Sequence, residues 1–194
     1  MNGPSTFVHP AALCETTSVG EGTRIWAFAH VLQGAVIGAS CNLCDHTYVE
    51  GGVVMGDRVT LKNGVAVWDG VVLHDDVFVG PNAVFTNDLV PRAAPHRTSP
   101  DALSRTIVEH GATIGANATI VCGSTIGAHA LVGAGAVVTG DVPCHALVVG
   151  VPARQVGWIC CCGARLTPPW SCPCGRDFAT HGRGLAVVTV LRRR

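Results

Sequence analysis

A six-residue periodicity of apolar side chains is the feature that most constrains how this chain can fold. Every sixth residue from Phe7 to Phe85 is apolar, and the same spacing resumes from Val108 to Val138. A second column, two positions before each apolar residue, holds small or β-branched side chains. Both columns point inward if short strands form coils of three hexads and each coil packs on its neighbours. The periodicity therefore predicts an all-β chain folded as a parallel β-helix.

A β-sandwich is the competing interpretation, because its strands also alternate apolar and polar residues. Alternation alone does not give glycine a constant phase, whereas this chain has glycine at eighteen-residue intervals at Gly20, Gly38 and Gly56. Tight bends between short strands favour glycine. The glycine phase therefore favours coils of eighteen residues over a sandwich.

The periodicity breaks once, between Phe85 and Val108. The interval between these residues is not a multiple of six, and it contains three prolines. We expect residues 88–105 to form a loop that projects from one corner of the coil stack, and such insertions are commonly functional. The repeat ends before the C-terminus, which predicts a β-helix domain at residues 1–157 and a small cysteine-rich tail at residues 158–194.

The composition favours a compact protein without a polyanionic partner. Of the 194 residues, 48% are apolar, and 13 basic side chains balance 13 acidic ones. The charges are interspersed, so we expect neither nucleic acid nor a membrane as partner. The N-terminus lacks the basic and apolar segments of an export signal, and no apolar run is long enough to span a bilayer. We therefore expect a cytoplasmic protein whose ten cysteines are reduced.

Four cysteines near the C-terminus form two pairs, Cys160 with Cys162 and Cys172 with Cys174. Four thiolates can close a tetrahedral structural zinc site, and a segment with so few apolar residues would gain stability from one. Common zinc ribbons have two residues between paired ligands, whereas each pair here has one. The alternative is a reduced, partly disordered tail whose last strand, residues 185–191, packs on the coils.

Several motifs resemble those of hexapeptide-repeat acyltransferases. They are GATIGANATIVCGSTIG from Gly111, VGAGAVVT from Val132 and VGVPAR from Val149. Further segments, within residues 7–160, resemble the nucleotide-sugar 3-N-acetyltransferases: GTRIWAFAHV from Gly22, NLCDH from Asn42, VWDG from Val67, DVFVGP from Asp76, FTND from Phe85 and PR from Pro91. The resemblance implies left-handed coils and a homotrimer. It also implies that acetyl-CoA and a nucleotide-linked amino sugar meet between adjacent coils of that trimer.

Two branches of that family share features with this chain. The segments NLCDH and TND resemble the enzymes acting on dTDP-3-amino-3,6-dideoxyhexoses, whereas RQVGW from Arg154 resembles those acting on UDP-2-acetamido-3-amino-uronates. A uronate carboxylate calls for a dedicated cation. The candidates for that cation are Arg24, Lys62, Arg92 and Arg97. The first branch is our preferred interpretation, and the second is the alternative.

Counting by eighteen along the repeat places Gln33, Gly51, Asp69 and Asn87 in one column at a corner of the stack. Asp69 and Asn87 would then lie on successive coils, about 4.8 Å apart. Asn87 also opens the expected loop. The resemblance implies that the reacting amine binds here, so Asp69 and Asn87 are candidate substrate-binding and catalytic residues. The alternative is a pair of solvated turn residues.

Acetyl transfer to an amine needs a neutral nucleophile, a positioned thioester and a donor for the developing oxyanion. An amine with a pKa near 7.7–8.0 is neutral in about one molecule in ten at pH 7, a deficit of only about 1 kcal/mol. Positioning can therefore dominate, with Asp69 and Asn87 holding the amine and the thiolate or water taking the proton. Asp69, His30 and His46 are the candidate bases, although a lone histidine is more often structural.

The resemblance also supplies candidates for ligand binding. The residues expected to bind the cofactor are Gly111, Gly133, Gly135 and Arg154. The glycine N–H groups would contact the amide arm or the thioester, because glycine permits close approach. Arg154 would neutralise phosphates, and Arg92 and Arg24 are the arginines expected to contact the substrate. The alternative for Arg92 is an exposed, solubilising side chain.

A non-catalytic β-helix that serves as a scaffold is the main functional alternative. In such proteins the coils persist while the cofactor motifs erode. This chain retains both the VGAGAVVT segment and the loop. We therefore predict an acetyl-CoA-dependent N-acetyltransferase that acts on the 3-amino group of a nucleotide-linked amino sugar.

Overall fold

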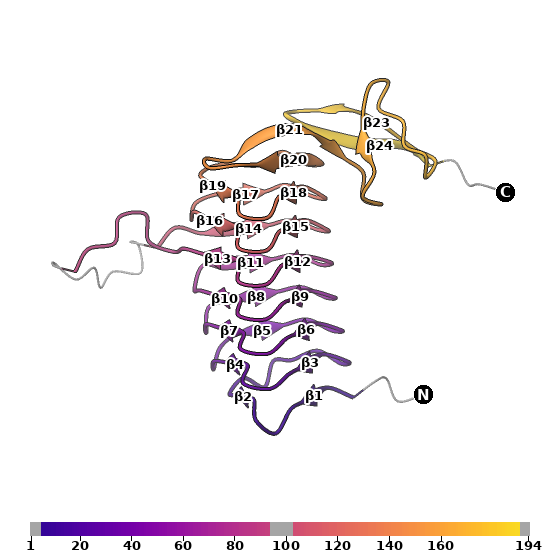
Figure 1. The fold of residues 1–194 in the computed structure, drawn as a ribbon. Coiled ribbons are helices and arrows are strands. Elements are labelled where there is room, and N and C mark those ends of the chain that lie inside the picture. The colour runs from indigo at the N-terminus through magenta and orange to yellow at the C-terminus, as the bar shows by residue number, and fades with distance from the viewer. Residues whose placement is uncertain (1–4, 94–102, 191–194) are drawn as a thin grey trace.

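The computed structural model describes residues 5–93 and 103–190, and every regular element within these ranges is a β-strand. The chain winds into a parallel β-helix with three short strands per coil, and the corresponding strands of successive coils pair to form three sheets (Figure 1). This architecture confirms the fold predicted from the six-residue periodicity. No helix that could cross a membrane is found in the part of the chain that the structure describes.

The first sheet extends along the whole stack and into the C-terminal strands. In spatial order it contains β1 (Phe7–Val8), β3 (Arg24–Ile25), β6 (Asn42–Leu43), β9 (Thr60–Leu61), β12 (Phe78–Val79), β15 (Thr113–Ile114), β18 (Leu131–Val132), β20 (Ala146–Val149), β21 (Arg154–Ile159) and β22 (Arg165–Leu166). The second sheet contains β2 (Leu13–Cys14), β4 (His30–Val31), β7 (Tyr48–Val49), β10 (Ala66–Val67), β13 (Val84–Phe85), β16 (Thr119–Ile120) and β19 (Val137–Val138). The third sheet contains β5 (Val36–Ile37), β8 (Val54–Met55), β11 (Val71–Leu73), β14 (Thr106–Val108) and β17 (Thr125–Ile126). A separate hairpin consists of β23 (Arg176–His181) and β24 (Gly184–Val190).

Successive coils pair in parallel with the eighteen-residue register that the repeat predicts, as between Val36 and Val54. The turns between the strands form three corners. The corner between the second and third sheets is termed the loop edge here, and consists of residues 32–35, 50–53, 68–70, 86–93, 103–105, 121–124 and 139–142. The corner between the third and first sheets is termed the histidine edge, and consists of residues 38–41, 56–59, 74–77, 109–112, 127–130 and 143–145.

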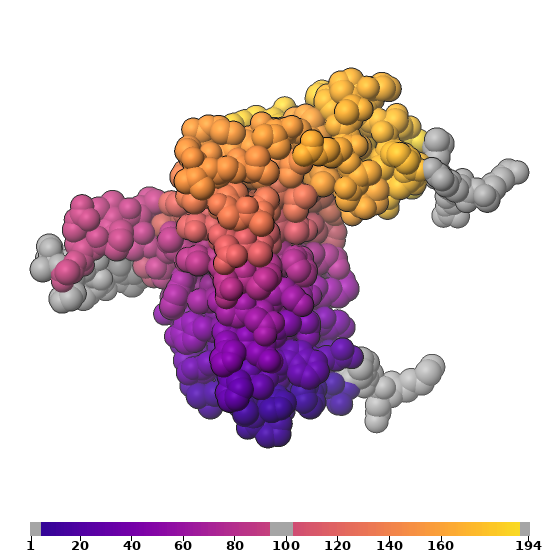
Figure 2. All heavy atoms as spheres, in the orientation of Figure 1, coloured from indigo at the N-terminus to yellow at the C-terminus, as the bar shows by residue number. Residues whose placement is uncertain are grey.

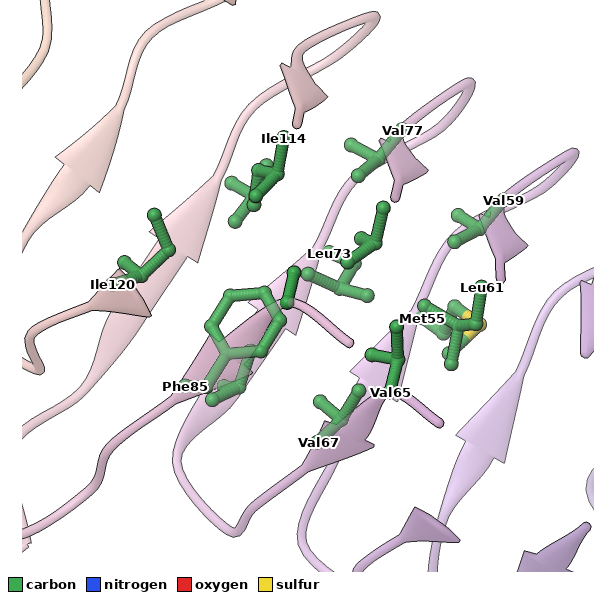
Figure 3. Close-up of a cluster of buried hydrophobic side chains, with 14 of the residues drawn as sticks. Met55, Val59, Leu61, Val65, Val67, Leu73, Val77, Phe85, Ile114 and Ile120 are labelled. Carbon is green, nitrogen blue, oxygen red and sulfur yellow. The ribbon is translucent and has the colours of Figure 1, made fainter. Parts of the chain in front are cut away.

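The core is a column of apolar side chains contributed by all three sheets. From Ile25 onward to Val138, the residues of the six-residue ladder are at most 3% exposed. Figure 3 shows how Leu73, Phe85 and Ile114, one from each of the three sheets, fill the interior. Full burial of such a side chain stabilises the fold by about 1.5–3 kcal/mol. Stacking of coils therefore holds the β-helix together, as the repeat requires.

The first coil departs from the predicted register. Phe7 and Leu13, which the periodicity assigns to the interior, are 42% and 54% exposed. Cys14 pairs with the inward-facing Val31, one position short of the regular offset between coils. The regular offset returns at Val19, so the turn after Cys14 is one residue short. The inward assignment of Phe7 and Leu13 is therefore wrong, because a shift of one residue turns each side chain to the other face of its strand.

The break in the periodicity is an insertion at the loop edge. Leu73 pairs with Met55 on one side and with Val108 on the other, so the insertion nearly doubles the length of this coil. At its base the N–H of Ser104 donates a 2.9 Å hydrogen bond to the carbonyl oxygen of Asn87. Asp88 forms an antiparallel bridge to the returning chain. The described part projects sideways from the stack, which confirms the predicted loop (Figure 2).

The C-terminal strands form a cap (residues 154–190) over the last coil. β20 still pairs in parallel with β18, but β21 and β22 continue the first sheet in antiparallel directions, and β23 and β24 form a hairpin. The cap has its own cluster of buried side chains, which are Cys160, Leu166, Cys172, Phe178 and Leu185. β21 crosses the predicted boundary at residue 157, so the β-helix and the tail share this strand.

Candidate functional site

One column of residues on the loop edge collects polar groups from successive coils. In coil order this column contains Gln33, Gly51, Asp69, Asn87, Cys122 and Gly140. Asp69 and Asn87 therefore occupy the same corner of adjacent coils, about 4.8 Å apart along the stack, in agreement with the eighteen-residue count. Their part in catalysis stays a prediction.

The carboxylate of Asp69 lies over the turn of the preceding coil. A Cβ atom added to Gly52 would overlap Asp69 Oδ1, so only glycine leaves room for the carboxylate. The N–H of Asp69 donates a 2.6 Å hydrogen bond to Glu50 Oε2. These contacts orient Asp69 and place a second carboxylate next to its main chain. Sequence reasoning missed Glu50, because it lies one position outside the eighteen-residue column.

Asn87 lies where the chain leaves the stack for the loop. Its carbonyl oxygen accepts the hydrogen bond from Ser104 that closes the loop base. The preceding residue, Thr86, accepts a 3.0 Å hydrogen bond through Oγ1 from the N–H of Cys122 on the following coil. The loop base is therefore tied to the stack, and these contacts hold the half-buried Asn87 at the corner.

A row of side chains on the second sheet leads along the loop edge toward Asp69. His30 Nε2 lies 2.9 Å from Glu15 Oε1, and this hydrogen bond holds the pKa of the Glu15 carboxyl below its ordinary value. The His30 ring packs edge-on against Tyr48 at a centroid distance of 5.6 Å. The Tyr48 ring in turn lies 5.4 Å from Trp68, the residue before Asp69. Aromatic and imidazole rings thus line the approach to the column.

His30 is too far from Asp69 to act directly on an amine held there by the same chain. His30 pairs with Tyr48, which pairs with Ala66 on the coil of Asp69. Two strand spacings, about 10 Å, therefore separate His30 from that coil, whereas proton transfer needs hydrogen-bond reach. The sequence carries no signal for Glu15 as partner of His30, because the short first coil shifts Glu15 out of register.

His46 and Arg24 lie on other parts of the stack. His46 is an exposed turn residue between the first and second sheets, and its ring stacks on Phe28 at a centroid distance of 5.0 Å. Arg24 lies on the exposed face of the first sheet. Neither residue shares the loop edge with Asp69, so a single chain does not bring them together with Asp69.

The three candidate glycines fall at two corners. Gly111 lies on the histidine edge, whereas Gly133 and Gly135 lie between the first and second sheets. The N–H of Gly111 donates a 2.9 Å hydrogen bond to the carbonyl oxygen of Asp75. The N–H of Gly133 donates to that of Val148 at 2.8 Å, and the N–H of Gly135 donates to that of Ala116 at 2.9 Å. They are therefore paired within the chain and are not the free donors expected from the sequence. Open space surrounds only Gly135 of the three, so close approach of a cofactor there stays a prediction.

Arg154 begins β21 next to the last turn of the loop edge. It lines a cavity of about 250 Å³ together with Thr139, Asp141 and Arg183. This turn lies two coils beyond Asn87, on the same corner of the stack. Two guanidinium groups at one cavity suit a ligand that carries phosphate. Within one chain, the loop edge therefore carries both the Asp69 and Asn87 column and a basic cavity.

The loop cations are only partly described. Arg92 is exposed, and its Nη1 donates a 3.1 Å hydrogen bond to the carbonyl oxygen of Pro91. Arg97 lies outside the described residues. A role of Arg92 in substrate binding stays a prediction.

The four candidate zinc ligands converge within the cap. The Sγ atoms of Cys160, Cys162, Cys172 and Cys174 all lie within 4.8 Å of one another. Nη1 of Arg176 donates a 3.1 Å hydrogen bond to Cys174 Sγ. Hydrogen bonds from Cys172 and from Arg176 lower the pKa of Cys174 to about 6, whereas burial raises the pKa of Cys160. The structure thus brings together the four cysteines that the sequence singles out.

A row of histidines along the histidine edge has no counterpart in the sequence analysis. The rings of His110, His129 and His145 follow one another at centroid distances of 5.1 Å, edge-on, and 5.0 Å, tilted, and the His145 ring lies 4.9 Å from that of Phe178 in the cap. His145 Nδ1 lies 2.9 Å from the carbonyl oxygen of Ile159. Burial lowers the pKa of both His129 and His145. Their unequal spacing in the sequence gives no periodic signal, so the row could not be predicted.

Known proteins share sequence with this chain, both within its repeats and along nearly its whole length. A family model described as a hexapeptide repeat of succinyl-transferase matches residues 33–68 and 105–140. A dTDP-3-amino-3,6-dideoxy-alpha-D-galactopyranose 3-N-acetyltransferase from Aneurinibacillus thermoaerophilus is 50% identical over 175 residues, covering 89% of this chain and 90% of the relative. An acyl-[acyl-carrier-protein]--UDP-N-acetylglucosamine O-acyltransferase from Brucella ovis is 40% identical over 52 residues, covering 26% of this chain and 19% of the relative.

A solved structure shares the fold. A variant of AntD, an N-acyltransferase from Bacillus cereus in complex with dTDP and coenzyme A, has a TM-score of 0.50 and 20% identity, covering 80% of this chain and 85% of that chain. At this identity the likeness concerns the fold alone. The Aneurinibacillus enzyme, in contrast, matches at 50% identity along nearly the whole of both chains. The repeat, the coils and this relative together show that the chain belongs to the hexapeptide-repeat family of nucleotide-sugar 3-N-acetyltransferases.

Proposed function

We propose that this protein transfers an acetyl group from acetyl-CoA to the 3-amino group of a dTDP-3-amino-3,6-dideoxyhexose. The observation that carries the proposal is the 50% identity to an enzyme named for that reaction, along 90% of that enzyme's length. The galacto sugar in the relative's name is the first substrate to test. The Asp69 and Asn87 column and the loop base at the loop edge support the same reaction.

The reaction needs little more than positioning at this corner. The neutral amine forms a C–N bond to the thioester carbonyl carbon as the C–S bond breaks, and the surplus amine proton passes to the thiolate or to water. Asp69 and Asn87 hold the amine by hydrogen bonds, with Asp69 as the candidate base. Asp69 suits this role because Gly52 and Glu50 orient it. Fixing the amine against the thioester supplies most of the rate acceleration.

We propose that acetyl-CoA binds along the loop edge beyond the loop. The supporting feature is the cavity next to Arg154 and Arg183, two coils past Asn87, which suits the phosphates of the cofactor. AntD has the same fold and was solved with dTDP and coenzyme A, so a fold of this type accommodates both ligands. Glu15, His30 and Tyr48, on the earlier coils of the same edge, then face the sugar side of the site.

We also infer a homotrimer. The outer face of the third sheet is a stripe of β-branched apolar residues, Val36, Val54, Val72 and Ile107, which occupy matching positions on successive coils. Val36 and Val54 are each 46% exposed in the single chain. We propose a second copy of the chain as the occupant of this stripe, with its His46 and Arg24 meeting the loop edge of the first chain.

The direct test is release of coenzyme A thiol from acetyl-CoA in the presence of dTDP-3-amino-3,6-dideoxy-D-galactose, followed by mass spectrometry of the acetylated sugar. We expect turnover with this sugar and a gain of one acetyl group at the 3-amino position. The gluco epimer in a parallel reaction tests the configuration at C4. If no amino-sugar nucleotide releases thiol, and calorimetry finds no acetyl-CoA binding, the scaffold alternative stands instead.

The uronate branch is tested in the same assay. UDP-2-acetamido-3-amino-uronate is expected to react at least ten-fold more slowly, as measured by kcat/KM. A preference for the uronate would move the function to the second branch. The proposal that the protein transfers an acetyl group to a 3-amino sugar would still hold.

A further inference from the structure

The two cysteine pairs of the cap form two turns with the same backbone geometry. In the first, the N–H of Gly163 donates to the carbonyl oxygen of Cys160 at 2.8 Å, and the N–H of Cys160 donates to that of Ala164 at 2.8 Å. In the second, Gly175 donates to Cys172 at 2.9 Å, and Cys172 donates to Arg176 at 2.8 Å. Both glycines have φ of 88°. One turn therefore repeats in each Cys-x-Cys-Gly segment, with its two thiols facing those of the other turn.

The sulfur atoms are spaced for a shared ion and are not bonded to one another. Across the two turns, Cys160 Sγ lies 3.6 Å from Cys174 Sγ and Cys162 Sγ lies 3.4 Å from Cys172 Sγ, and all four cysteines are free. A disulfide has an S–S length of about 2.0 Å. A tetrahedron with Zn–S bonds of about 2.3 Å has S···S edges of about 3.8 Å. Both distances lie near the tetrahedral spacing.

We propose that Cys160, Cys162, Cys172 and Cys174 bind one structural zinc ion that holds the cap on the β-helix. Four thiolates complete a tetrahedron and leave no open position for a substrate, so the ion is structural. A zinc ion with four thiolates carries a formal charge of −2, and the guanidinium of Arg176 donates to Cys174 Sγ and offsets part of it.

The position of the turns gives the ion a mechanical role. The cap buries few apolar side chains, and two of them are the ligands Cys160 and Cys172. Cys160 directly follows β21, the strand that extends the first sheet and begins at Arg154. Trp158 of the same strand packs against both the core of the β-helix and the core of the cap. The ion therefore ties the hairpin side of the cap to the strand that closes the stack.

Metal analysis of the purified chain tests the proposal without substrate or activity. Protein purified with reductant and dialysed against metal-free buffer should contain about one zinc ion per chain by plasma mass spectrometry, as a closed four-thiolate site retains its metal. After removal of zinc, addition of Co²⁺ should give the visible absorption of a tetrahedral thiolate site. Less than a tenth of an equivalent of zinc, together with no cobalt spectrum under reductant, would overturn the proposal.

Matched cysteine variants test the ligand assignment. Cys162→Ala and Cys174→Ala should each lower the zinc content at least five-fold. Cys161→Ala is the control, because Cys161 is an exposed neighbour in the same turn and is outside the four-sulfur group. It should keep one equivalent. Equal loss of zinc from Cys161→Ala, or alkylation and mass spectrometry that find two disulfides among the four cysteines in the native protein, would contradict the assignment.

Discussion

Gly52 lies on the coil below Asp69, at a position where a methyl group would meet the candidate catalytic carboxylate. A Cβ atom at Gly52 overlaps Asp69 Oδ1, and Gly52 does not adopt a positive φ, so alanine can adopt the backbone but must displace the carboxylate. We expect Gly52→Ala to lower kcat/KM by about 100-fold, as misplacement of about 1 Å does in other active sites. Steady-state kinetics with the dTDP-linked sugar measures the loss.

Gly157→Ala is the control for that substitution, because no atom lies within 4 Å of a Cβ atom added at Gly157. Its kinetics should match those of the parent protein. The melting temperature of Gly52→Ala should fall by only a few degrees. Full activity of Gly52→Ala would contradict the proposal that the reaction depends on the present position of the Asp69 carboxylate.

Asn87 offers a test of the amine site from the other coil. Its main chain closes the loop base through its carbonyl oxygen, so truncation of the side chain leaves that contact intact. We expect Asn87→Ala to lower kcat by about 100-fold or more, the usual loss when one positioned hydrogen-bonding group is removed from an active site. Thermal unfolding should change little.

The matched control for Asn87→Ala is Gln33→Ala, in the same column on an earlier coil. Gln33 is exposed, and its side chain has no role in the proposed reaction. Its variant should keep full activity. Unaltered kinetics for Asn87→Ala would remove Asn87 from the mechanism and favour the alternative of a solvated turn residue.

At the scale of the strands, the periodicity predicts the elements where the coils repeat, and it fails where the chain departs from the repeat. From Val19 to Val138 the eighteen-residue count holds apart from the loop, because burial repeats with it. Phe7 and Leu13 keep the six-residue spacing, but their side chains point outward. The turn that is one residue short could not be predicted from the sequence, because the residues that replace them in the pairing, Val8 and Cys14, are apolar too. The antiparallel strand β21 has no periodic pattern at all, so its pairing with β20 could not be predicted.

In the candidate site too, the sequence predicts the features that follow from the repeat and misses those that depend on other contacts. The column of Asp69 and Asn87 follows from counting, because both lie in repeated coils. The contact of Asp69 with Glu50 depends on side-chain direction, and the pairing of His30 with Glu15 depends on the register of the first coil. A linear pattern does not carry that information.

The histidine edge links the last coils to the cap and predicts a pH dependence of stability. Burial lowers the pKa of His129 and His145, and the neighbouring His145 and His110 lower that of His129 further, with Arg176 adding to this and Asp76 opposing it. An unfolded histidine titrates near 6.5, so below that pH the unfolded chain binds more protons than the folded one. The free energy of unfolding is then highest above about pH 6.5 and falls as the pH drops toward the folded-state values.

Thermal unfolding between pH 7.5 and pH 5 measures this effect, and we expect the melting temperature to fall as the pH drops, because the pKa of both histidines is lowered in the folded chain. His129→Asn should reduce the fall, because asparagine tolerates the φ of 56° at this position and does not titrate. His74→Asn, at an exposed residue of the same edge, should leave it unchanged. Equal pH dependence in His129→Asn and the parent protein would contradict a contribution from the row.

For the whole molecule, the loop edge of one chain holds only part of the proposed site. The Asp69 and Asn87 column and the Arg154 cavity share that corner, whereas Arg24 and His46 lie on other faces of the stack. We predict that contact between chains brings the two sets together. The third sheet offers the surface for this contact, with a shallow groove of about 470 Å³ lined in part by Val54 and Val72.

Assembly through the third sheet is therefore the prediction for the molecule as a whole. Light scattering should give a mass of about 60 kDa, three times the 20.0 kDa chain. Val54→Lys places a charge in the apolar stripe and should yield a folded monomer by light scattering and circular dichroism, with acetyl transfer lost because the site is divided between chains. Val188→Lys, at a valine of the cap that is 60% exposed, is the control and should stay trimeric and active. A monomeric parent protein that turns over substrate, or a Val54→Lys protein that remains trimeric, would contradict assembly through this face.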